Sequence, residues 1–410
     1  MTATTAAALR TLAGLLLGLA AGVTVAALIP ERGDSLLALA DPIGTLWLNA
    51  LKLTVIPLVL ALLISGLASA ADTARAGGLA ARSLGIFAVM LLLSATLAIT
   101  AGPALLALSP PPPGLAAAIP PGTTLPSPPP LSQWVNGLIP PNIFKALADG
   151  SMLQIVIFGL ALGFAALTLS PQRRAALLAP IDALADAMLV IVGWVLWAAP
   201  LGVFALAFGL GERAGVAGVG TLVHYVGFVS LMCILSLLLA WLLAWVWGGV
   251  PPLRFIRALG PALAVGLGTQ SSLATLPLMV KASGELGVPD RVTRLTLPLA
   301  VTTFRITSPM ANMAVVLYCA AILDIDYSTG ALIAAAATAL LMSFTVVSLP
   351  SQITFFAALI PIGTVLGVPP EIYVPFLAVE ILPDLFRTIG NVVADVSAAT
   401  IAARGERKTD

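Results

Sequence analysis

A stripe of polar and ionisable side chains lies inside an otherwise apolar run near the C-terminus. At 100° per helical residue, these side chains fall within an arc of roughly 100° and share one face of a helix. The run, residues 374–403, is long enough to span a bilayer, where each ionisable group costs at least about 2.5 kcal/mol. Such a face could bind a charged small molecule, a cation, or both. This polar stripe consists of Glu380, Asp384, Arg387, Thr388, Asn391 and Asp395.

The composition is that of a protein embedded in a lipid bilayer. Of 410 residues, 60% are apolar and only 9% are charged, against about 25% charged in ordinary soluble domains. We expect neither a nucleic-acid partner nor an enzyme, because the sequence has no glycine-rich nucleotide loop and no cluster of metal ligands. The single histidine, His224, lies in an apolar segment, and these residues indicate no cofactor.

Apolar runs of spanning length predict an all-α protein that crosses the membrane many times. Lys and Arg residues concentrate on one side of the predicted arrangement, so both termini are expected in the cytoplasm and the protein in the cell inner or plasma membrane. The Pro-rich stretch 109–141 is interpreted as an external loop. The first spans are predicted at residues 6–29, 42–70, 83–108, 150–169, 179–211 and 216–248.

Two later apolar segments are interrupted near their middles. Segment 253–285 breaks at residues 268–272, and segment 328–366 breaks at the Ser348-Leu349-Pro350 turn. Each half is too short to cross a bilayer, so both segments are predicted to be re-entrant helical hairpins flanking a full span at 291–322. Interrupted segments of this kind indicate the substrate site of a transporter. The alternative is that the interruptions only kink ordinary helices.

Several motifs, taken together and in order, resemble the dicarboxylate/amino acid:cation symporter family, the glutamate transporter homologues. The resemblance extends over nearly the full chain. The Asp-x-x-Arg-Thr-x-x-Asn-x-x-x-Asp pattern of the polar stripe matches that family's eighth helix without a gap, and Ser-Ser-Leu-Ala-Thr-Leu-Pro at 271–277 resembles the tip of its first hairpin. The other matching segments are 51–59, 139–149, 152–156, 199–204 and the Asn312-Met313 pair.

The resemblance implies a glutamate-transporter-like elevator fold with eight transmembrane helices and two re-entrant hairpins, assembled as a homotrimer. A transport core would slide through the membrane against a static scaffold. The implied divisions are scaffold helices 1–2 at 1–82; helix 3, the external loop and helix 4 at 83–175; helices 5–6 at 176–250; and the transport core at 251–410. Within that core lie hairpin 1 (253–285), helix 7 (291–322), hairpin 2 (328–366) and helix 8 (370–404).

The resemblance also implies roles for the polar residues. Asp384 would take a substrate amino group, and Arg387 would pair with a substrate carboxylate. Asn391 and the first hairpin would hold the main carboxylate, although Thr388 and Asn391 could instead make interhelical hydrogen bonds. The implied substrate set is Ser271, Ser272, Ser348, Leu349, Pro350, Asp384, Arg387, Thr388 and Asn391; the implied sodium ligands are Ser308, Asn312, Asn391 and Asp395.

The chain departs from the family pattern where a second cation site is expected. Ala314 and Val316 replace an aspartate and a threonine, and Met90 and Leu93 replace a tyrosine and a threonine, with only Ser94 retained. An apolar site of this kind does not hold sodium.

Arg305 is a second departure, seven residues before Asn312 and hence on nearly the same helical face. The charges of two aspartates and two arginines sum to zero here: Asp384, Asp395, Arg387 and Arg305. Arg305 could therefore be a tethered cation that reduces sodium coupling. Alternatively, Arg305 bonds to helix-end carbonyls or Glu380 and only stabilises packing.

Three functions remain open. The first is a symporter of acidic amino acids or C4-dicarboxylates with reduced sodium coupling. The second is a transporter of the same fold for another small carboxylate or a neutral amino acid, uncoupled or driven by protons through Asp395 or Glu380. The third is a sensor, scaffold or channel that no longer transports.

Overall fold

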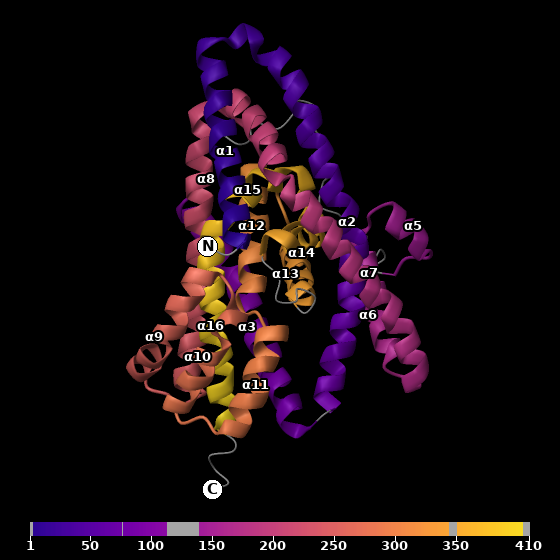
Figure 1. Ribbon diagram of the computed structural model, residues 1–410, viewed down its shortest axis with the longest axis vertical. Coiled ribbons are helices and arrows are strands. Elements are labelled where there is room, and N and C mark those ends of the chain that lie inside the picture. Colours follow the sequence, from indigo (N-terminus) through magenta and orange to yellow (C-terminus); the bar gives the residue numbers. More distant parts are fainter. Residues whose placement is uncertain (1–2, 76, 113–138, 344–350, 405–410) are drawn as a thin grey trace.

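The computed structural model describes residues 3–75, 77–112, 139–343 and 351–404, and every regular element in these ranges is a helix. Figure 1 shows α1 and α2 forming a long hairpin at one end, whereas α9, α10, α11 and α16 gather at the other. This agrees with the predicted all-α class. The helices of the N-terminal half are α1 (Ala3–Leu28), α2 (Gly33–Arg75), α3 (Gly78–Leu108), α5 (Ile143–Ala148), α6 (Met152–Ala166), α7 (Pro171–Trp197) and α8 (Ala199–Val246), with a 3-10 turn at Pro30–Arg32.

Small residues let α1 pack closely against α8. Gly14, Gly18 and Gly22 recur every four residues, and a Cβ at each would lie only 2.5, 2.4 and 2.1 Å from a backbone oxygen of α8. Side chains larger than hydrogen would force the two helices apart. The glycine spacing therefore fixes this contact.

The boundary between α7 and α8 corrects one predicted span. The prediction placed a span at 179–211, but α7 ends at Trp197 and α8 begins at Ala199, with Pro200 in its first turn. A proline is tolerated in the first turn of a helix, because the N–H that it lacks would have no helical partner there. Helix α8 then changes direction at Gly215, whose φ of 58° only glycine adopts freely.

The first interrupted segment folds as two helices, α9 (Pro252–Thr269) and α10 (Ser272–Glu285), which pack against each other. The chain turns at Gln270, which adopts a left-handed conformation (φ 52°, ψ 32°). The second segment gives α13 (Thr329–Ser343) and α14 (Ser351–Leu366), which also contact each other. Its predicted tip lies outside the described residues.

The predicted span at 291–322 is not one continuous helix. It is divided into α11 (Asp290–Thr303) and α12 (Thr307–Ile322), with an extended backbone at Phe304 (φ −118°, ψ 126°). Arg305 lies in this break, so helical periodicity does not apply between it and Asn312. Periodicity fails because it assumes an unbroken helix between the two residues.

The helices that carry most of the polar residues lie in the core. Helix α16 (Ile381–Ala403) follows a 3-10 turn (Pro370–Tyr373) and the short α15 (Val374–Val379). It contacts α8, α9, α10, α11, α12 and α3, and it is buried on almost every side after Gly390. Helix α12 is buried from its first residue to Ala320. Polar groups on these helices must therefore find partners inside the protein.

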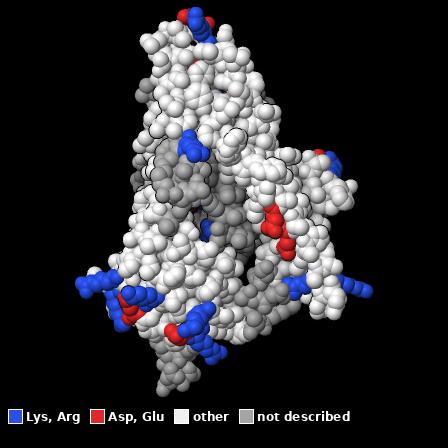
Figure 2. Space-filling model, in the orientation of Figure 1, with Lys and Arg blue, Asp and Glu red and all other residues white. Residues whose placement is uncertain are grey.

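The surface agrees with a membrane protein. In Figure 2 most of the visible surface is uncharged, and the charged side chains form small groups, several of them toward the lower end. Four helical segments of the described residues are long and apolar enough to cross a bilayer, one of them being Asp290–Ile322, which includes the break between α11 and α12. The number is five if the bent pair Ala13–Leu28 and Pro30–Ala50 forms one span. The predicted eight spans, the elevator fold and the four divisions of the chain stay predictions.

Candidate functional site

The polar stripe of α16 faces the break between α11 and α12. Thr307, the first residue of α12, donates from its backbone N (3.2 Å) and its Oγ1 (2.9 Å) to the Asn391 Oδ1 atom. Gly390 permits this approach, because a Cβ there would lie 2.6 Å from the Thr307 Cγ2 atom. Asn391 therefore caps the N-terminus of α12 and makes the interhelical bond that was the alternative to its substrate role.

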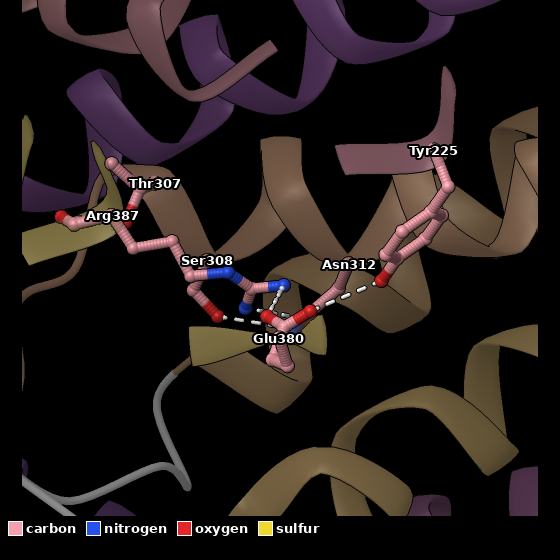
Figure 3. Close-up of polar contacts among 6 residues, drawn as sticks. All are labelled: Tyr225, Thr307, Ser308, Asn312, Glu380 and Arg387. Atoms are coloured by element: carbon pink, nitrogen blue, oxygen red, sulfur yellow. Dashed lines mark hydrogen bonds and ion pairs between the residues drawn. The ribbon is translucent and has the colours of Figure 1, made fainter. Parts of the chain in front are cut away.

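Arg387 is the centre of a buried ion-pair network (Figure 3). Its Nη2 atom lies 2.7 Å from the Oε1 atom of Glu380, and its Nη1 atom donates to the Asn312 Oδ1 atom at 3.2 Å. The Arg387 side chain is 11% exposed and that of Glu380 is fully buried. The Arg387 Nε atom has no hydrogen-bond acceptor among the described residues. The guanidinium therefore keeps a buried N–H donor that no described residue uses.

Glu380 is held from a second side by Tyr225 of α8, whose hydroxyl donates to the Oε2 atom at 3.0 Å. The sequence did not single out Tyr225, because a tyrosine in an apolar helix carries no local sign of its partner. Its ring stacks on Phe376 of α15 with centroids 4.2 Å apart. This stacking fixes the direction of the hydroxyl.

Two of the predicted sodium ligands bond to each other. Asn312 donates from Nδ2 to the Ser308 Oγ atom at 3.3 Å, and its oxygen already accepts from Arg387. Asn391 likewise uses its oxygen to accept from Thr307. Within the described ranges no group of three or more His, Cys, Asp or Glu residues could hold a metal ion. The Asn391 oxygen already accepts two hydrogen bonds and would have to exchange a partner to bind sodium, whereas the Asn312 oxygen accepts one.

Asp395 differs from these residues. It is 1% exposed, and neither carboxylate oxygen has a hydrogen-bond donor among the residues that the structure describes. Asn391, one turn earlier on α16, accepts from Thr307, which lies two residues after Arg305. The break that carries Arg305 therefore lies against the part of α16 that carries Asp395.

The tip of the first hairpin contacts the start of α16. Gln270 donates from Nε2 to the Ile381 carbonyl at 3.2 Å, a contact that the sequence did not indicate. Ser271 caps α10 by accepting from the Ala274 backbone N at 3.3 Å. Gly266 backs onto Thr388, because a Cβ there would lie 3.7 Å from the Thr388 Cγ2 atom. The hairpin therefore closes one side of the site.

The structure brings together five of the predicted site residues. Arg387, Asn391, Asn312, Ser308 and Glu380 lie at the meeting point of α12 and α16. Ser271, Ser272 and Asp384 are half-buried, and Thr388 is buried. The predicted residues Ser348, Leu349 and Pro350 lie outside the described residues.

Comparison with known proteins identifies the family. Residues 8–405 match the sequence profile of the sodium:dicarboxylate symporter family. The chain belongs to this family. Sodium:dicarboxylate symporters are transporters, so the prediction that the chain is not an enzyme is confirmed. Its membership and its apolar helices also agree with a multi-pass membrane protein.

Curated members of the family align with the chain along nearly all of its length. The "Proton/sodium-glutamate symport protein" of Bacillus subtilis (strain 168) is 26% identical over 96% of this chain and 91% of its own. The "Proton/glutamate-aspartate symporter" of Escherichia coli (strain K12) is 25% identical over 97% and 93%. The "C4-dicarboxylate transport protein" of Deinococcus radiodurans is 25% identical over 97% and 89%.

The departures from the family pattern lie in apolar surroundings. Ala314, Val316 and Met90 are fully buried within the hydrophobic core. Ser94, the retained hydroxyl, donates to the Ile306 carbonyl at 2.6 Å and so helps to fix the break before α12. At Ala314, Val316 and Met90 the symporter therefore has buried apolar side chains where the family pattern has side chains with oxygen atoms.

Proposed function

We propose that the protein is a secondary active transporter that carries an acidic amino acid or a C4-dicarboxylate together with a cation across the cytoplasmic membrane. The observation that supports this most is the buried Arg387 guanidinium, which keeps a donor at Nε in a site closed by the first hairpin. The names of its relatives give the same two substrate classes. A planar fork of N–H donors suits a carboxylate in both.

Family membership further supports an elevator mechanism, a homotrimer and cytoplasmic termini, with sodium as one candidate co-transported ion. In the described residues, α9, α10, α11 and α12 all contact α16, which fits a core that moves as one body. Reduced sodium coupling is proposed from Ala314 and Val316, because aliphatic side chains offer no oxygen to a hard cation.

A second candidate is a transporter of the same fold that takes another small carboxylate or a neutral amino acid and is driven by protons or uncoupled. The Glu380–Arg387 ion pair favours it, because Glu380 already neutralises the guanidinium. A ligand without a side-chain carboxylate would leave that pair intact.

Uptake into proteoliposomes tests these functions. Labelled aspartate, glutamate, malate and leucine are offered with a sodium gradient, a proton gradient or neither. Acidic substrates alone, driven by a cation gradient, would support the first function; leucine uptake would support the second. An Arg387→Ala variant serves as the negative control, and an Arg294→Gln variant, changed at an exposed residue of α11, as the positive one. No flux of any substrate would contradict both functions.

A further inference from the structure

Asp395 is a buried carboxylate that lacks the partners a buried charge needs. It is 1% exposed, lies in the middle of α16, and accepts no hydrogen bond from any described residue. An isolated charge at such a site is strongly unfavourable unless a cation compensates it. The compensating cation is a mobile ion, a proton that the carboxylate itself binds, or a fixed side chain.

Arg305 is positioned to be that fixed cation. It lies in the break between α11 and α12, is half-buried, and its Nε atom is fully buried without an acceptor in the described residues. Two contacts hold the break: Ser94 donates to the Ile306 carbonyl, and Thr307 donates to Asn391. Asn391 lies one helical turn before Asp395 on α16. The contact between Thr307 and Asn391 therefore brings the break that carries Arg305 to the part of α16 that carries Asp395.

The Glu380 contact changes the charge count of the site. The sequence-based sum of zero omitted Glu380, which the structure pairs with Arg387 at 2.7 Å. Three carboxylates, Glu380, Asp384 and Asp395, now stand against the two guanidiniums of Arg387 and Arg305, a net charge of −1. Without Arg305 the net charge would be −2. The difference is one monovalent cation.

We propose that Arg305 is a tethered cation that compensates Asp395 in place of one mobile co-transported cation. The substrate-free site then needs a single monovalent cation for neutrality. This inference rests on the proposed function, because it concerns the ions that accompany the substrate. It makes Arg305 a determinant of ion coupling.

Sodium binding to the purified protein tests this without requiring transport. Thermal unfolding is followed while sodium chloride replaces choline chloride at constant ionic strength. The Arg305→Gln variant should gain sodium-dependent stabilisation, with a half-maximal concentration about tenfold or more below that of the wild type, because a repelling charge has left the site. Arg305→Lys, which keeps the charge, and Arg294→Gln, on the exposed surface of α11, should respond as the wild type does.

The double variant Arg305→Gln, Asp395→Asn separates charge compensation from packing. If Arg305 compensates Asp395, the double variant should lose the sodium response and be more stable than Arg305→Gln in choline. If Arg305→Gln cannot be purified, recovery of a folded double variant supports the proposal, and failure of both overturns it. An unchanged sodium response in Arg305→Gln also overturns it.

Uptake is measured separately in the same variants. A sodium response that moves as expected without substrate uptake would support the ion site and contradict the transport function. Substrate uptake together with a sodium response that is unchanged in Arg305→Gln would support the transport function and contradict the role of Arg305 in the ion site.

Discussion

Replacing Glu380 by glutamine should reveal whether this residue competes with the substrate for Arg387. The substitution keeps the shape of the side chain and removes the charge that lies 2.7 Å from the Nη2 atom. At about 4 Å between charge centres and an effective dielectric constant of about 20, the lost attraction is about 4 kcal/mol. Breaking one partner of a buried ion pair typically costs about 3–5 kcal/mol, which agrees.

The ligand-free Glu380→Gln protein should therefore unfold at a clearly lower temperature than the wild type. An acidic ligand should restore much of this loss, because its carboxylate now meets a guanidinium that is no longer paired with Glu380. We expect the affinity for aspartate or malate to rise by about tenfold or more, equivalent to about 1.4 kcal/mol or more. Isothermal titration calorimetry and thermal unfolding at fixed sodium concentration measure both effects.

The matched control is Tyr225→Phe. It removes the 3.0 Å hydrogen bond to Glu380 and leaves the ion pair in place. A hydrogen bond to a charged group contributes about 1.5–3 kcal/mol, so this variant should lose stability but gain less ligand affinity than Glu380→Gln. If Glu380→Gln binds acidic ligands no better than the wild type, Glu380 is not a competitor for Arg387.

Three further substitutions test other contacts of the site. Arg387→Cys should abolish the preference for acidic over neutral ligands in competition binding, and unchanged selectivity would remove Arg387 from the substrate site. Gly390→Ala places a methyl group 2.6 Å from the Thr307 Cγ2 atom and should cost about 1–3 kcal/mol, seen as a lower unfolding temperature. Asn391→Ala removes both bonds from Thr307 and should cost about 1–3 kcal/mol in the same measurement; a wild-type value would mean that water replaces the amide.

The turn of the first hairpin could be predicted from the local sequence. The break predicted at 268–272 coincides with the left-handed residue Gln270 and with the Ser271 cap of α10, because turn and cap chemistry is encoded within a few residues. The boundary at Trp197 was missed, since an apolar run on both sides of a break gives no change in hydropathy.

Arg305 shows where periodicity misleads. Seven residues separate it from Asn312, and an unbroken helix would place both on one face. The extended backbone at Phe304 divides that helix. The contacts that hold the break come from Ser94 and Asn391, which are 212 and 84 residues away from their partners. A residue pattern along one segment does not carry such information.

The sequence by itself determined the membrane-embedded class, the family and the polar stripe of α16, because hydropathy, motif order and helical periodicity are local properties of the chain. Only the tertiary structure decided which charges neutralise one another. It paired Arg387 with Glu380, brought Tyr225 to Glu380 from 155 residues away, and placed Arg305 in a helix break that Asn391 of α16 helps to hold. Electrostatic energy depends on distances between atoms, and these are set by how α8, α12 and α16 pack.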